Sequence, residues 1–168
     1  MAYYDIIPSP LGDVFVGGSD EGVHRIDFLS DDRDLGWFVD RLEREAGEPA
    51  HRDPEAAAPA VEELQRYFAG EQRDFDFPLA PRGTPFQLAV WEAERRVPAG
   101  AVTTYGEVAS AIGRPTAARA VGAATGKNPL TIVVPCHRVV GANGALTGYA
   151  SGLDRKRWLL RHEGAPVG

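Results

Sequence analysis

The sequence has 168 residues, of which 43% are hydrophobic, and it carries a net charge of −6 at pH 7. This length and composition fit one ordinary globular domain or two small ones, and the absence of a long apolar run argues against a membrane-spanning helix. The single cysteine excludes an internal disulfide and a zinc site with several thiolate ligands.

The charges are segregated along the chain. Residues 1–84 have a net charge of −11, residues 85–113 of −1 and residues 114–168 of +6. Such asymmetry indicates that the basic C-terminal third has a surface for a polyanion. A solvated basic face without a partner is the alternative.

The first half predicts a small antiparallel sheet followed by helices. Residues 3–8, 12–18 and 22–28 are short β-branched or aromatic runs separated by Pro, Gly, Ser and Asp. Residues 34–47 and 58–70 place apolar side chains three or four positions apart. Each of these two runs ends at a glycine, which is typical of a helix C-terminus.

A segment rich in proline, residues 74–83, predicts a linker. We therefore expect an N-terminal scaffold domain over residues 1–80 and a C-terminal domain over residues 81–168. The second domain begins with a strong helix start, in which Thr84 is the N-cap and Gln87 completes a capping box. The predicted buried stripe of this helix consists of Phe86, Ala89, Val90, Ala93 and Val97.

Two short helices joined by a tight turn predict a helix-turn-helix. The first covers residues 105–112 behind the capping pair Thr104 and Glu107, and the second covers residues 117–126. The second helix is almost entirely Ala and Gly, and Arg119 is its only long polar side chain. Such a bare helix either packs tightly on another helix or lies against a ligand backbone, and the lone arginine favours the ligand.

The only cysteine, Cys136, follows an apolar run, residues 130–134, that predicts a buried strand. A last helix is predicted over residues 153–164, with Asp154 as its N-cap. Glu163 lies in the final turn of this helix, where the helix dipole disfavours a carboxylate. Residues that break such a local rule often mark a functional site.

The thiol of Cys136 is a candidate nucleophile, although a lone cysteine can also be a small core residue. Burial among Val and Leu raises the pKa of a thiol, so a neighbouring group must take its proton. His137 is adjacent in sequence, but successive residues of an extended chain point to opposite sides, so a bridging water would have to link them. Glu163 would then orient and charge-stabilise the imidazole.

The sequence resembles the O6-alkylguanine-DNA alkyltransferase family in the segments ARAVGAATGKNP, PCHRVVG and LTGYASGLDRKRWLLRHEG. The likeness covers residues 85–168 almost continuously, whereas the N-terminal half resembles the family only in length and strand pattern. The resemblance implies an α+β fold. It would combine an N-terminal ribonuclease-H-like antiparallel sheet and its helices with a mostly helical C-terminal domain, which holds a helix-turn-helix and a short active-site strand.

The resemblance also implies a function, direct-reversal DNA repair by a single-turnover, self-inactivating methylated-DNA--[protein]-cysteine S-methyltransferase. The helix-turn-helix would bind the minor groove of double-stranded DNA, and an O6-alkylguanine, or an O4-alkylthymine, would be flipped out of the stack. The alkyl group would move to Cys136. The transfer is irreversible because the thioether product, unlike a thioester, has no carbonyl for water to attack.

Particular residues take roles through this resemblance. The catalytic set would be Cys136, His137, Glu163 and Tyr105, in which Tyr105 donates to the guanine ring. The DNA-binding set would be Arg119, Arg114, Thr116, Ala120, Gly122, Lys127 and Arg138, with Arg119 filling the gap left by the flipped base. The substrate pocket would contain Val139, Tyr149, Ala150, Ser151, Asn128 and Lys156, with Asn128 as a hinge. Without the resemblance, Tyr105 would be a core aromatic and Lys156 a surface charge.

No cofactor and no metal are expected, because the thiolates of the zinc site that some family members carry are missing. We expect a cytoplasmic monomer that does not bind membranes, since the N-terminus lacks the pattern of a secretory signal. Cooperative binding along DNA is left open. Ala150 and Ser151 stand where many members have Ser or Gly, so the pocket width and the choice between methyl and bulkier groups are also open.

Other classes of protein compete with DNA repair. A cysteine hydrolase would use Cys136 with His137 or His162 and would need an oxyanion hole, for which the sequence gives no sign. A protein that only marks alkylated bases would have replaced the cysteine. A plain helix-turn-helix regulator would need neither the PCHR segment nor Tyr105. The presence of Cys136 in this setting therefore favours repair.

Overall fold

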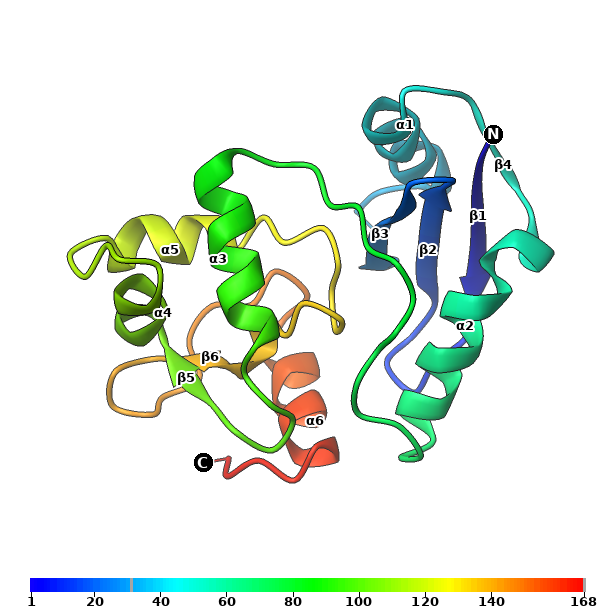
Figure 1. The fold of residues 1–168 in the computed structure, drawn as a ribbon. Coiled ribbons are helices and arrows are strands. Elements are labelled where there is room, and N and C mark those ends of the chain that lie inside the picture. Colours follow the sequence, from blue (N-terminus) through cyan, green and yellow to red (C-terminus); the bar gives the residue numbers. More distant parts are fainter. Residues whose placement is uncertain (31, 168) are drawn as a thin grey trace. The chain divides into compact units, whose positions relative to one another are not determined.

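The computed structural model describes residues 1–30 and 32–167. Its contacts divide the chain into two compact units, each of which is traced in Figure 1. Unit 1 consists of Met1–Arg82 and the short segment Pro129–Thr131, and unit 2 contains the remainder. No helix within the described ranges is both long and apolar enough to cross a membrane.

Unit 1 is built on a four-stranded sheet of order β3-β2-β1-β4. The strand β2 (Val14–Ser19) pairs antiparallel with both β1 (Ala2–Ile7) and β3 (Gly22–Phe28), which confirms the three predicted strands. The strand β4 (Ala50–Arg52) was not predicted, and it pairs with β1 in parallel. The sheet is therefore mixed at one edge.

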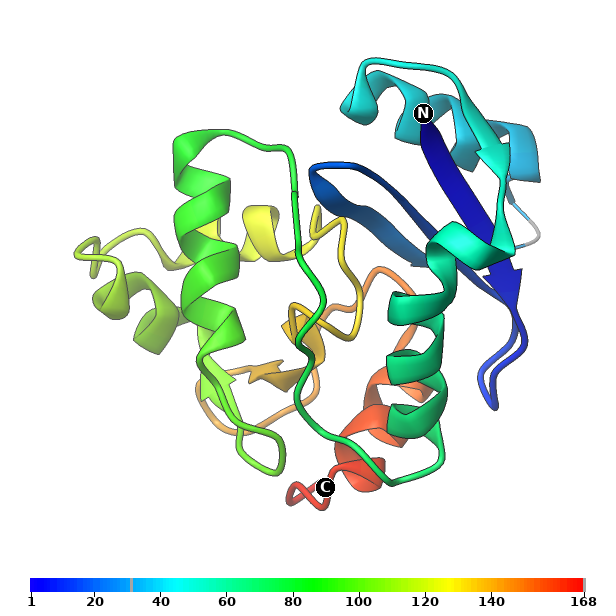
Figure 2. The ribbon, with the colours of Figure 1, turned by 45° about the vertical axis from the view of Figure 1, so that its right-hand side comes forward.

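Two helices pack on this sheet, as Figures 1 and 2 show. In α1 (Leu35–Ala46), the N-cap Asp34 accepts a hydrogen bond from the Trp37 amide, and Gly47 ends the helix with a φ of 74°. The helix α2 (Pro54–Phe68) begins four residues before its predicted start. Asp53 caps it there by accepting from the Ala56 amide, and Pro54 suits the first helical position because its missing N–H needs no partner.

Unit 2 is mostly helical. Its elements are α3 (Pro85–Arg95), β5 (Thr103–Thr104), α4 (Tyr105–Ala111), α5 (Ala118–Thr125), the 3-10 helix η1 (Cys136–Arg138), β6 (Val139–Val140) and α6 (Leu153–His162). The short strands β5 and β6 pair in parallel, and α4 packs against α5 across a tight turn. The predicted helix-turn-helix is therefore present.

The start of α3 is as predicted, but its buried face is not. Thr84 and Gln87 form the expected capping box. The buried residues of the helix are Val90, Trp91 and Glu94, whereas Ala89 from the predicted stripe is exposed. A carboxyl group at a buried position is an exception to the rule that a helix buries its apolar face.

Two further expectations for unit 2 are wrong. Residues 130–134 do not form a strand. Leu130 makes one isolated parallel bridge to Ile26, and Ile132 then adopts a φ of 78°, which breaks the pleat of an extended chain. Asp154 is not the N-cap of α6, because the helix begins at Leu153, behind Gly152, without a side-chain cap.

Candidate active site

Cys136 begins the 3-10 helix η1, directly after Pro135, and only 7% of its surface is exposed. Burial raises the pKa of its thiol to about 12, and a hydrogen bond from the Asn128 side chain opposes this rise only in part. The thiol is therefore protonated at neutral pH, and it can attack only if a base takes its proton as the reaction proceeds.

His137 is the base that lies beside this thiol in the chain. Its side chain is completely buried, and Nε2 lies 2.8 Å from Oε2 of Glu163. An ionised carboxylate can only accept hydrogen bonds, so Nε2 carries the imidazole proton. Nδ1 is consequently a lone-pair acceptor, and it has no hydrogen-bond partner among the described residues.

The relation between the two neighbours differs in one respect from the expectation. Cys136 and His137 lie in a 3-10 helix rather than an extended chain. Consecutive side chains of such a helix are about a third of a turn apart, so they still do not face each other directly. A bridging water between the thiol and Nδ1 remains a prediction.

Glu163 follows the last turn of α6 and is 1% exposed. Burial alone would raise the pKa of its carboxyl, but the hydrogen bonds and charges of His137 and Arg138 outweigh burial and lower this pKa to about 2. Arg138 contributes two of these bonds, from Nε to Oε1 at 2.8 Å and from Nη2 to Oε2 at 2.9 Å. Glu163 is therefore a carboxylate even though it sits where the helix dipole disfavours one.

The position of Arg138 corrects one expectation. Arg138 was predicted to contact DNA phosphate, but it is 5% exposed, and its guanidinium donates to Glu163 and to the carbonyl oxygen of Val97. The hydrogen bonds of its guanidinium group thus lie within unit 2. Because Arg138 neutralises Glu163, burial can lower the pKa of His137, which leaves a neutral imidazole that is able to accept a proton.

Lys156 is fully buried rather than on the surface. Its Nζ donates to the carbonyl oxygens of Val139, Thr147 and Gly148 at 2.6, 2.7 and 3.2 Å. Burial lowers the pKa of this lysine to about 8, and the charges that Cys136 and Glu94 carry when they are ionised oppose that shift. Lys156 thereby fixes the strand that follows the cysteine to the loop 141–152.

Tyr105 begins α4 and reaches the same loop, because its hydroxyl donates to the Thr147 carbonyl oxygen at 3.4 Å. Of the expected pocket residues, Val139 is buried, Tyr149 and Ser151 are half-buried and Ala150 is exposed. The amide of Asn128 donates to the Val134 carbonyl oxygen at 2.8 Å. This bond joins the segment after α5 to the residues just before Cys136.

The expected DNA-binding residues other than Arg138 lie on or beside the helix-turn-helix. Gly122 is half-buried, and a Cβ built on it would lie 3.8 Å from the Tyr105 ring, so this part of α5 approaches Tyr105 closely. The exposed members of the set are Arg114, Thr116, Arg119, Ala120 and Lys127. The exposed side chains of α5 are thus small and uncharged, except for Arg119.

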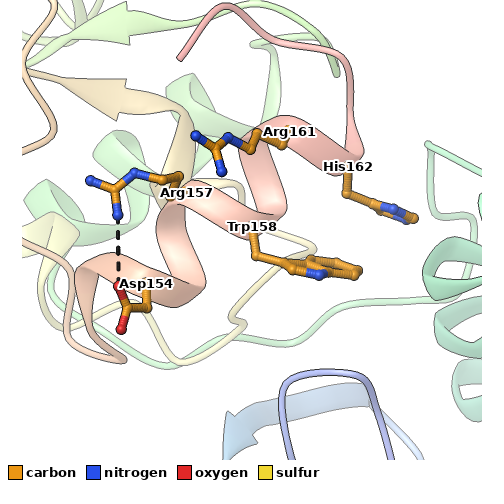
Figure 3. A pocket seen from close by; sticks show the side chains of 5 residues that line it. All are labelled: Asp154, Arg157, Trp158, Arg161 and His162. Carbon is orange, nitrogen blue, oxygen red and sulfur yellow. Dashed lines mark ion pairs between the residues drawn. The ribbon is translucent and has the colours of Figure 1, made fainter. Parts of the chain in front are cut away.

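His162 belongs to a different place in unit 2. It lies on α6 beside Trp158, with ring centroids 4.5 Å apart and nearly parallel planes, as Figure 3 shows. Both rings line a pocket of about 610 Å³ together with Asp154, Arg157 and Arg161. The histidine that engages Glu163 is His137, so the geometry favours His137 as the base.

The sequence did not predict a role for Glu94. It is completely buried on α3, and its charge acts on both Cys136 and Lys156. Its spacing could have predicted its burial, because Glu94 falls four residues after Val90 and three before Val97, on the face that was predicted to be apolar.

Comparison with known proteins assigns the family. The sequence model of the 6-O-methylguanine DNA methyltransferase DNA-binding domain matches residues 85–165, and that of the ribonuclease-like domain of the same protein matches residues 2–81. The chain therefore belongs to the 6-O-methylguanine DNA methyltransferase family. This result confirms the family that the PCHR segment suggested.

Individual relatives agree along almost the whole chain. A methylated-DNA--protein-cysteine methyltransferase of Methanosarcina acetivorans is 46% identical over 163 residues, which cover 97% of this chain and 99% of the relative. The crystal structure of Mycobacterium tuberculosis O6-methylguanine methyltransferase superposes with a TM-score of 0.84 at 42% identity, covering 100% of this chain and 97% of that one. The M. tuberculosis OGT in complex with DNA gives the same TM-score at 43% identity, covering 98% and 95%.

Proposed function

We propose that this protein repairs DNA by moving an alkyl group from O6-alkylguanine to Cys136. The observation that carries the proposal is the chain of contacts behind the thiol. His137 presents an unpartnered basic Nδ1, its Nε2 proton is held by Glu163, and Glu163 is fixed by Arg138. This is a nucleophile, a base and an orienting group in the arrangement that activates a buried thiol.

The reaction breaks the bond between the O6 oxygen and the alkyl carbon and forms a bond between that carbon and the sulfur. The thiol proton passes to His137 through a bridging water, and the imidazolium is stabilised by the Glu163 carboxylate. Tyr105 donates a hydrogen bond to the guanine ring as the ring gains negative charge, and the ring then takes up the proton that the thiol released, which leaves guanine in the DNA. The thioether product cannot be hydrolysed, so each protein acts once.

The helix-turn-helix supplies the DNA contact in this proposal. The bare surface of α5 lets a duplex backbone approach, and Arg119 enters the stack where the base has left it. Extruding the base costs a few kcal/mol, and the exposed cations Arg114 and Lys127 help to offset this cost at the phosphates. Asn128, Lys156 and the loop 141–152 shape the pocket. We expect the same chemistry on O4-alkylthymine, carried out by a cytoplasmic monomer.

The test is to incubate the protein with duplex DNA that contains O6-methylguanine and to measure the mass of the intact protein. Repair predicts a single added methyl group that peptide mapping locates on Cys136, and a Cys136→Ser variant that gains none. A protein that binds the duplex tightly without an adduct would be one that only marks lesions. A protein that hydrolyses an ester substrate repeatedly, and gains no methyl group from the duplex, would be a hydrolase. Either result would overturn the proposal.

A further inference from the structure

Glu94 is a buried carboxyl group for which the proposed reaction has no role. It is 0% exposed on the inner face of α3, beside Val90 and Trp91. One oxygen, Oε2, lies 2.7 Å from the hydroxyl of Thr125 on α5. The other, Oε1, has no hydrogen-bond partner within the part of the chain that the structure describes.

The Thr125 hydroxyl gives a Glu94 carboxylate little stabilisation. The Thr125 hydroxyl is 2.7 Å from Glu94 Oε2 and also 2.8 Å from the carbonyl oxygen of Val121. A threonine hydroxyl has one proton to donate, and a carbonyl oxygen can only accept. The one Thr125 proton is therefore divided between Glu94 Oε2 and the Val121 carbonyl oxygen, so a Glu94 carboxylate receives only part of one hydrogen bond.

No positive charge neutralises Glu94 directly. Among the described residues it forms no ion pair with a lysine, arginine or histidine. Lys156 is the cation whose charge reaches it, but the three protons of that ammonium group already point to three carbonyl oxygens. Burial accordingly raises the pKa of Glu94 to about 7, against the Thr125 hydrogen bond and the Lys156 charge.

The helix α3, which holds Glu94, packs against η1, the 3-10 helix that begins at Cys136. The groups that act on the charge of Cys136 are Glu94 from α3, which disfavours a thiolate, and Lys156 from α6 and the amide of Asn128, which favour it. When Glu94 is neutral, no charge on it opposes the effect of Lys156, which favours the thiolate of Cys136. An ionised Glu94 places a second negative charge in the same low-dielectric interior and makes the thiolate harder to form.

We propose that Glu94 is a positioning residue, a neutral buried acid whose ionisation slows alkylation of Cys136. Alkaline conditions then have two opposing effects, because they help to remove the thiol proton but also ionise Glu94. This inference deepens the proposed repair function, since it concerns the same acceptor thiol. It predicts a rate that rises with pH less steeply than one titrating thiol would give.

The experiment measures alkylation of the full-length chain by iodoacetamide as a function of pH. Cys136 is the only cysteine, so one added carbamidomethyl group reports this thiol alone. Glu94→Gln replaces the neutral acid with an amide whose oxygen can accept from Thr125 in the same way but which cannot ionise. The matched control is Glu92→Gln, which removes a carboxylate from an exposed position of the same helix.

We expect Glu94→Gln to react at the wild-type rate at pH 6 and roughly three- to tenfold faster above pH 8, because a neighbouring like charge shifts a pKa by up to about one unit. Glu92→Gln should follow the wild type throughout. A constant ratio between Glu94→Gln and wild type at every pH would indicate only a change of packing and would overturn the inference. An equal effect in Glu92→Gln would overturn it as well.

A second measurement detects the proton itself. The infrared difference spectrum between wild type and Glu94→Gln at pH 6 should contain the carbonyl stretch of a protonated carboxyl group, and this band should vanish at pH 9. A spectrum without that band at pH 6 would contradict a neutral Glu94. Neither measurement uses DNA, so a failure of methyl transfer from the duplex would count against the proposed function and leave this inference standing.

Discussion

The imidazole of His137 donates from Nε2 to Oε2 of Glu163 across 2.8 Å, in a site that is closed to solvent on both sides of the bond. This contact fixes the tautomer, so the second nitrogen of the ring is a base. Arg138 holds the same carboxylate, and the positive charge that balances Glu163 therefore belongs to an arginine rather than to His137. The base is neutral before the reaction and can accept a proton during it.

Replacing His137 by alanine tests this base. We expect single-turnover methyl transfer to slow by about 10²- to 10⁴-fold at pH 7.5, which is the usual contribution of a general base. Because burial raises the thiol pKa to about 12, the residual rate should increase with each pH unit from 7 to 9, by less than tenfold where Glu94 ionises in the same range. His162→Ala is the control and should keep the wild-type rate. A His137→Ala variant with an unchanged rate and pH profile would remove the relay.

The carboxylate of Glu163 predicts acid sensitivity. Its pKa is lowered from 4.5 to about 2 in the folded state, so the stability that it contributes is complete above pH 4.5 and is lost as the pH falls through 2. This contribution is about 3 kcal/mol. Urea unfolding between pH 2 and 6 should therefore show a steep loss of unfolding free energy in the wild type and a shallower loss in Glu163→Gln. Parallel curves would show that this carboxyl is not specially stabilised.

Arg138 and Arg114 should behave differently, although both were expected to contact phosphate. Arg138→Met leaves the Glu163 carboxylate buried with no arginine partner, which should lower the free energy of unfolding by about 3–5 kcal/mol. Arg114→Ala removes an exposed cation and should leave stability almost unchanged. It should reduce the slope of log K for duplex binding against log salt by about one. A loss of salt dependence in Arg138→Met, measured where that variant is folded, would restore its phosphate role.

Arg119 tests the base-flipping step separately from the chemistry. Arg119→Ala should slow repair of O6-methylguanine in a duplex much more than it slows alkylation of Cys136 by free O6-benzylguanine, because only the duplex must be unstacked. The two rates can be compared in single-turnover assays. Lys127→Ala is a useful comparison, since it removes an exposed charge beyond the end of the same helix. Equal losses on the duplex and on the free base would exclude a role in the stack.

Much of the fold follows from the sequence because its signals are local. Asp34 and Thr84 cap their helices through contacts three residues away, and a glycine at Gly47 ends a helix without cost. The strand β4 could not be predicted in this way. It has three residues, two of them exposed, and it exists because β1 offers a free edge. The irregular backbone before Cys136 could not be predicted either, because an apolar run has the same composition whether or not Ile132 takes a positive φ.

The site was predictable in its chemistry and less so in its electrostatics. Cys136, His137 and Glu163 were identified because a thiol needs a base and a base needs an orienting group. Arg138 was misplaced because a charged side chain is expected at the surface, and its burial depends on the opposite charge of Glu163. Glu94 was missed because it too is a charged residue type that is expected at the surface. Both glutamates are buried, but their partners differ, the Arg138 guanidinium and the His137 N–H for Glu163 and a hydroxyl for Glu94, and their pKa values separate to about 2 and about 7.

In the proposed reaction, one thiol accepts one alkyl group and keeps it. The most direct measurement counts the guanines that are restored when a large excess of O6-methylguanine duplex is added to a known amount of protein. We predict a burst of one restored guanine per chain, followed by no further product, and none with Cys136→Ser. Continued production after the first equivalent, or normal restoration by Cys136→Ser, would contradict it.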